Sequence, residues 1–149
     1  MKKLSLAYAI ALASIAGSTY ALEAQVVPVT ASVLGVCKFV GTIGTVSFGP
    51  IDPSTTGVKT APLAFTYRCT KGTSPTSITA SAITPMVGAL ASPDSIPFTV
   101  GAFAAGVLGV GFAAGAPSSG GATLSIAQAA YQDVKADSYT GSVTVTINP

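Results

Sequence analysis

Histidine and tryptophan are absent from this chain, and only 8% of its 149 residues are charged. Without histidine, neither a Ser-His-Asp triad nor a Cys-His pair can form. A basic surface for nucleic acid is also missing, since seven Lys and Arg stand against five Asp and Glu. Two carboxylates, Asp133 and Asp137, would share a face only if the segment 125–137 were helical, and no further catalytic residue accompanies them. We therefore expect neither an enzyme nor a nucleic-acid-binding protein.

Metal and cofactor sites lack their usual residues as well. The chain has no Cys-x-x-Cys motif, and the segment 52–57 (DPSTTG) offers one carboxylate where calcium needs several oxygen ligands. The glycines of 109–115 (GVGFAAG) do not have the spacing of a dinucleotide fingerprint. We predict no metal and no cofactor, and we interpret 52–57 as a turn that Asp52 opens and Gly57 closes.

The first residues have the pattern of a secretion signal. Two lysines precede an apolar run over 4–17, and Thr19 and Ala21 supply the small residues that a signal peptidase requires. We predict a signal peptide over 1–21, with a cut after Ala24 as the alternative. The apolar run has 14 residues, which is shorter than the roughly 20 that cross a bilayer and disfavours a membrane anchor.

The chain has two cysteines, Cys37 and Cys69, and an exported chain with an even number most simply pairs them. Closing a loop of about 33 residues would stabilise the fold by roughly 3.7 kcal/mol if the effect is entropic. We therefore predict a structural disulfide.

Short segments with strand character fill the rest of the chain, and turns rich in Gly, Pro, Ser and Thr separate them. Such spacing predicts an all-β sandwich or barrel. The segment 125–137 is the exception, as either one short helix or a loop. The expected strands span 45–48, 63–69, 77–83, 96–103, 107–112, 122–126 and 142–147.

The last expected strand alternates most regularly. Val143, Val145 and Ile147 fall on one face, and Thr144 and Thr146 fall on the other. Because no sequence follows to cover it, we expect this strand to leave an open edge of unpaired N–H and C=O groups.

The opening of the mature chain, QVVPVTASVLGVC over 25–37, alternates in the same way. Val27, Val29, Ala31 and Val33 are the candidates for its inward face. Few residues of the mature chain precede this segment, so we expect part of it to pair outside its own subunit.

An uncharged stretch over 98–116 has two interpretations. Its 19 residues would suffice for a membrane helix, and Gly111 and Gly115 have the spacing of a helix-dimer motif. Five of those residues are glycine, which weakens a helix. We favour strands joined by small-residue turns and keep the membrane helix as an alternative.

Four segments in this order resemble the spore coat protein U domain, a family that includes pilins of the archaic chaperone-usher pathway. They are VTASVLGVCKF, VSFGPIDPST, FTYRCTKGTSP and DSYTGSVTVTINP. The middle of the chain departs from the family, with a lone Met86 and no Trp, so the role of 86–121 stays open. The positions that match the family pattern are Cys37, Phe48, Gly49, Asp52, Cys69, Thr70, Gly72 and Tyr139.

The resemblance implies an incomplete immunoglobulin-like sandwich that lacks one strand. In such a family a periplasmic chaperone lends a strand, an outer-membrane usher exchanges it, and the extension of an identical or related subunit replaces it. The implied organisation is a donor-strand extension over 22–30 and a pilin domain over 31–149. Val143, Val145 and Ile147 would border the groove that receives the donor.

The function that the resemblance implies is that of a structural subunit of a cell-surface fimbria, which supports attachment and biofilm formation. The alternative is a stand-alone or tip-located adhesin, which would call for exposed aromatic side chains in a groove. An anchored protein that uses 98–116 and a hydrolase that uses Asp133 and Asp137 are further alternatives.

Overall fold

The computed structural model describes residues 24–90, 93–113 and 115–149. The predicted signal peptide over 1–21 lies outside these residues, as do the first two residues of the predicted donor extension. The chain divides into two units, Met1–Ser32 and Val33–Pro149. In the first unit, residues 24–32 contain no strand and every one of them is exposed.

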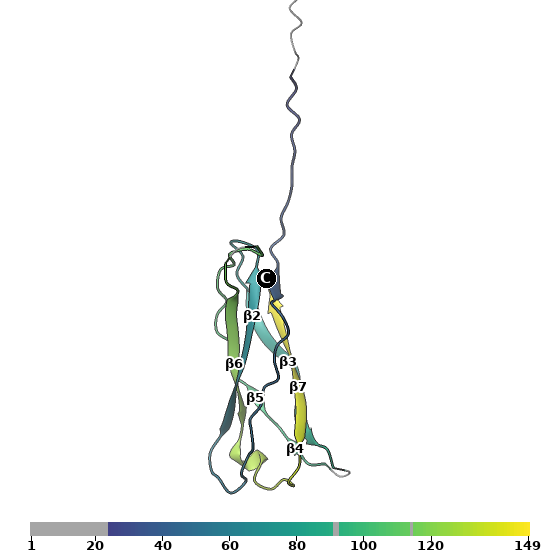
Figure 1. Ribbon diagram of the computed structural model, residues 1–149, viewed down its shortest axis with the longest axis vertical. Coiled ribbons are helices and arrows are strands. Elements are labelled where there is room, and N and C mark those ends of the chain that lie inside the picture. The colour runs from purple at the N-terminus through teal and green to yellow at the C-terminus, as the bar shows by residue number, and fades with distance from the viewer. Residues whose placement is uncertain (1–23, 91–92, 114) are drawn as a thin grey trace, which may run out of the picture. The chain divides into compact units, whose positions relative to one another are not determined.

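The second unit consists of two antiparallel sheets (Figure 1). One sheet has the strand order β1-β2-β6-β5 and the other has the order β4-β3-β7. The prediction of an all-β fold is thus confirmed. The elements are β1 (Cys37–Phe39), β2 (Lys59–Cys69), β3 (Ser77–Gly88), β4 (Ser95–Ile96), β5 (Thr99–Val100), β6 (Ser118–Ile126), the 3₁₀-helix η1 (Gln128–Ala130) and β7 (Tyr139–Asn148).

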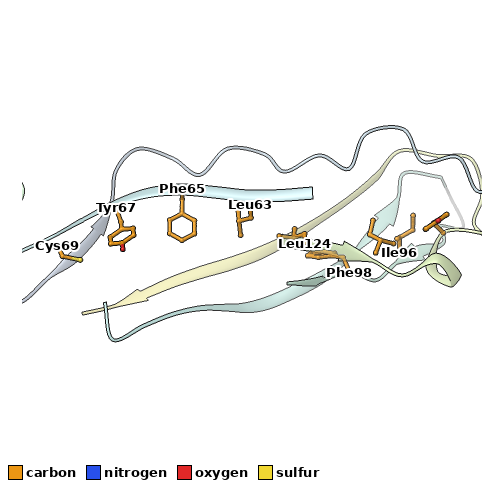
Figure 2. Close-up of a cluster of buried hydrophobic side chains, with 9 residues drawn as sticks. Leu63, Phe65, Tyr67, Cys69, Ile96, Phe98 and Leu124 are labelled. Carbon is orange, nitrogen blue, oxygen red and sulfur yellow. The ribbon is translucent and has the colours of Figure 1, made fainter. Parts of the chain in front are cut away.

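Strand β2 supplies the largest part of the core. Its odd-numbered residues from 61 to 69 are buried, because successive side chains of a strand point to opposite faces. Leu63, Phe65 and Tyr67 lie in a row on the inner side of β2 (Figure 2). The ring of Phe65 packs edge-on against Phe39 of β1, with 5.3 Å between the ring centroids. The first sheet therefore carries a well-buried apolar face.

The second sheet covers this face less completely. Its contribution to the buried core is Ile96 of β4, whereas the inward side chains of β3 and β7 are half-buried. The half-buried residues that pack against the core from these two strands are Ile78, Met86, Tyr139, Val143, Val145 and Ile147.

Four of the expected strands are confirmed, and all four extend further than the sequence suggested. They are the segments over 63–69, 77–83, 122–126 and 142–147. The strand expected over 96–103 is reduced to the two-residue strands β4 and β5, which belong to different sheets. In the segment 125–137 the only described helix is the single 3₁₀ turn of η1.

Two strand predictions are wrong for this chain as the structure describes it, while the pairing of the opening segment with another subunit stays a prediction. The opening segment 25–37 enters a strand only at Cys37, and the segments 45–48 and 107–112 have irregular backbone. Apolar alternation reports which side chains face a core, but a strand also needs a partner for its backbone groups. The described part of the chain provides no partner strand for any of these three segments.

The glycine-rich segment over 106–115 is a strap across the end of β2. The Gly109 N–H donates to the Thr73 carbonyl at 2.7 Å, and the Gly111 N–H donates to the Cys69 carbonyl at 3.2 Å. The Arg68 guanidinium donates to the Gly115 carbonyl at 2.6 Å. Glycine suits these positions because the strap backbone lies directly on the turn after β2. No described helix is long and apolar enough to span a bilayer.

Tyr131 secures the opposite end of the domain. Its side chain is buried, and its hydroxyl donates to the carbonyls of Thr55 and Gly57 at 3.1 and 2.7 Å. The same turn is closed at its other side by Asp52, whose carboxylate accepts from the Ser54 N–H at 2.9 Å. The interpretation of 52–57 as a turn is therefore correct.

The strap provides a stability test. In Gly109→Ala the new Cβ would lie 2.5 Å from the Cys69 carbonyl oxygen and 2.6 Å from that of Thr70. We expect a loss of about 1–3 kcal/mol in the free energy of unfolding, because both contacts are to backbone that must shift. Gly44→Ala is the matched control, since its Cβ would meet no atom within 4 Å. Equal urea unfolding midpoints for the two variants would contradict the close approach of the strap.

Candidate functional site

Strand β7 lies at the edge of its sheet. It pairs with β3 alone, from Ser77 opposite Asn148 to Gly88 opposite Tyr139. Every backbone hydrogen bond that the structure describes for β7 goes to β3 or to Thr76 just before it. The outward row of N–H and C=O groups on β7 is therefore open to another strand.

The segment 41–51 lies opposite the start of β7, where its residues 45–51 face Tyr139 across one cavity. It continues from β1, the edge strand of the first sheet, and β1 lies close to β7 without pairing with it. Within the described residues, no backbone group from 41 to 51 bonds to another backbone group. One backbone group of the segment bonds to a side chain instead: the Gly49 N–H donates to the Ser47 hydroxyl at 3.1 Å. Two rows of unpaired backbone groups thus border one opening.

The floor of this opening is apolar. From β7, Val143, Val145 and Ile147 contact the core and remain half-buried. Half-buried apolar side chains also come from the irregular segment, at positions 43, 46, 48 and 51. We call the strip between these two rows the edge groove; its members are Ile43, Val46, Phe48, Ile51, Val143, Val145 and Ile147.

The edge groove ends in a cavity of about 510 Å³. Residues 45–51 and Pro53 form one wall, and Met86, Ile96 and Tyr139 are among the residues that form the other. We call this end of the domain the cavity end and the end with Cys37 and Cys69 the disulfide end. Strand β7 runs from the cavity end, at its first residue, to the disulfide end, where Asn148 accepts from the Thr76 N–H at 2.9 Å.

Polar groups at the rim of the cavity are engaged with the backbone. The Asp137 carboxylate accepts from the N–H groups of Leu90 and Ser138 at 2.8 and 2.7 Å. The Tyr139 hydroxyl donates to the Lys135 carbonyl at 2.8 Å. Desolvation, followed by the charges of Asp94 and Asp137, raises the pKa of Tyr139. These groups order the loop before β7.

The carboxylates do not form the arrangement considered for a hydrolase. Residues 131–138 are not helical, so the condition that would place Asp133 and Asp137 on one helix face is not met. At the 52–57 turn, hydrogen bonds from the side chain and the backbone of Ser54 lower the pKa of Asp52. The described residues contain no group of three or more His, Cys, Asp or Glu side chains that could hold a metal ion.

The residues singled out in the sequence fall into two groups. Cys37 and Cys69 form the predicted disulfide, and their Cα atoms pair in register between β1 and β2. The inward face of β7 has the predicted members. In the opening segment, Val27, Val29 and Val33 are each at least 75% exposed, and Ala31 is exposed as well.

Sequence reasoning missed the segment 41–51 as a border of the groove. The signal was the spacing of Ile43, Val46, Phe48 and Ile51, which keeps one side apolar without the strict alternation of a paired strand. Apolar alternation alone predicts only a short strand over 45–48 in this segment.

No protein-family model, curated protein or solved structure matches this chain. The interpretation of the site therefore rests on the geometry of the edge groove and on the sequence itself.

The disulfide fixes the start of one border of the groove, because β1 has only three residues. Replacing Cys37 and Cys69 together by alanine should lower the free energy of unfolding by about 3–4 kcal/mol, through the larger entropy of the unfolded chain. Urea unfolding followed by circular dichroism measures this loss. The reduced wild-type chain is the control and should show the same loss; an unchanged midpoint in both would mean that the disulfide contributes nothing to stability.

Proposed function

We propose that this chain is a structural subunit of a cell-surface fimbria in which copies are joined by donation of a strand. The donor is the extension over 22–30, together with the residues up to Val33, and the acceptor is the edge groove of another copy. The observation that carries the proposal is the open edge of β7 opposite the unpaired segment 41–51. A strand added there gains backbone hydrogen bonds from the edge and specificity from alternate side chains in apolar sites.

The opening segment has the chemistry of such a donor. Val27, Val29, Ala31 and Val33 alternate with Pro28 and other residues that would face solvent. Ten residues of strand span about 33 Å, so a donor over 24–33 would match the ten residues of β7 in length. Each valine that moves from water into the groove would contribute about 1.5 kcal/mol or more. The proposal thus gives a burial site to side chains that are otherwise exposed.

The topology of the domain supports one direction for the donor. An antiparallel donor on β7 would enter at the disulfide end and leave at the cavity end, so its own domain would follow the cavity end of the acceptor. Every copy would then offer its disulfide end to the cavity end of another copy, which gives an open head-to-tail polymer. A parallel donor would instead bring the disulfide ends of two copies together. Each copy's extension joins its own domain at this end. We therefore propose antiparallel donation.

An open apolar groove also needs protection before assembly. The resemblance to archaic chaperone-usher pilins supplies the partners for this step: a periplasmic chaperone that lends a strand and an outer-membrane usher that exchanges it. The predicted signal peptide over 1–21 would deliver the chain to the periplasm. In this proposal the completed domain is an immunoglobulin-like sandwich, and the fimbria serves attachment and biofilm formation.

Donor exchange can be tested with a peptide. Deletion of residues 22–30 should abolish polymerisation, and the shortened chain should bind a peptide of residues 22–33 as a soluble complex. A Val29→Asp peptide should bind about 30-fold more weakly or worse, because losing the burial of the valine and burying a carboxylate together cost about 2 kcal/mol or more. A Thr30→Asp peptide is the matched control and should bind like the wild-type peptide. A purified wild-type chain that remains a stable monomer would contradict the proposal.

The direction of donation is tested by fusion. Residues 22–33 appended after Pro149 through a linker of about four residues should yield a stable monomer, because an antiparallel donor begins where β7 ends. A parallel donor would need a linker that crosses about 33 Å, or about ten residues. Thermal unfolding compares this fusion with a second fusion whose appended segment carries Val27→Asp and Val29→Asp. If only the long-linker fusion is stabilised, the donor runs parallel to β7.

A further inference from the structure

The described charged side chains are divided between the two ends of the domain. Lys38, Arg68 and Lys71 lie at the disulfide end, on β1, at the end of β2 and in the turn that follows. All four described aspartates lie at the cavity end, where two lysines accompany them. The described side chains thus give the disulfide end a formal charge of +3 and the cavity end a formal charge of −2. The members of the cavity end are Asp52, Asp94, Asp133, Asp137, Lys59 and Lys135.

The disulfide end also carries exposed apolar side chains. Two segments supply them, the start of the domain at Leu34 and the strap over 107–112. Both are held on the same turn, since the Thr70 hydroxyl donates to the Leu34 carbonyl at 3.1 Å and the Gly109 N–H donates to the Thr73 carbonyl. Their large apolar side chains are between 48% and 76% exposed. We call this set the disulfide-end patch; its members are Leu34, Val107, Leu108, Val110 and Phe112.

We propose that the disulfide-end patch, with Lys38 and Lys71, docks on the cavity end of the copy that accepts the extension. The proposal rests on donation of the extension as described above, and it adds a second contact between the same two copies. The chain enters the domain at Val33 and Leu34, directly beside the patch. A donor that leaves its acceptor at the cavity end would therefore bring the patch against that end.

Charge selects a second copy of this chain as the partner. The positive end of one domain would face the negative end of the next, whereas two like ends would repel each other. Apolar side chains surrounded by a few charges are typical of a protein interface rather than of a solvated loop. The same pairing would orient each incoming copy before its extension is exchanged.

The first test reverses the charge of the patch. Lys38→Glu with Lys71→Glu should slow elongation of preformed fimbriae roughly tenfold at low salt, and the difference should shrink as salt rises. Seeds that carry Asp133→Lys at the exposed cavity end should recover part of the rate for this variant only. Ser81→Glu with Thr123→Glu is the control, because both positions are exposed and lie inside β3 and β6 rather than at the ends of the domain. Equal rates for the two double variants would overturn the proposal.

The second test removes apolar surface. Leu108→Ser with Val110→Ser should make fimbriae dissociate at least tenfold faster in dilute urea, while Ile83→Ser in the middle of β3 should have no such effect. Retention of wild-type binding to the 22–33 peptide would show that the groove of each variant is intact. If the peptide binds and neither patch variant alters assembly, the docking proposal fails and strand donation stands. If the groove of the wild-type chain binds no peptide, strand donation itself fails. Binding of the wild-type patch to anionic vesicles, with assembly unchanged in the variants, would assign the patch to a membrane and also overturn the docking proposal.

Discussion

The requirement that backbone N–H and C=O groups find partners governs this domain. In the first sheet β2 pairs with β6 from Lys59 to Tyr67 and with β1 from Tyr67 to Cys69, and its side chains are the best buried. In the second sheet β7 meets the requirement on one edge only, and the segment 41–51 does not meet it at all within the described chain. The half-buried floor of the edge groove accompanies that shortage, because the described chain places no further strand beside β7 to cover its inward side chains. The open edge and the uneven core therefore go together.

The two ends of the domain differ because different interactions hold their loops in place. At the disulfide end a covalent bond and a glycine strap hold the turn after β2, and the strap backbone approaches so closely that larger residues have no room. At the cavity end Tyr131 and the carboxylates bind backbone groups of three loops, which concentrates acidic side chains there. In the proposed fimbria this difference would suit growth in one direction, since the two ends of the domain are not interchangeable.

Much of this architecture was accessible from the sequence, and the failures share one cause. The β2 and β7 patterns were recognised because alternation is strong where one face is buried and the other is wet. The segment 45–48 carries a similar apolar pattern for the same reason, yet periodicity cannot reveal whether a neighbouring strand exists. The apolar residues of the strap over 107–112 predict a strand, but their large side chains are exposed. The division of charge between the ends needs the topology, since Lys38 and Arg68 are far apart in sequence and opposite each other in the sheet.

The position of the Cys37–Cys69 bond has a mechanical consequence for a subunit linked through its opening segment. Tension would enter the domain at Val33 and reach β1, whose three residues of pairing would separate easily under load. The disulfide passes that load covalently to β2, which is anchored along its length to β6 and buried in the core. A pulling force would thus be spread over the best-packed strand of the domain instead of peeling its shortest one away. Reducing conditions would move the weakest point of such a tether from the donated strand to β1.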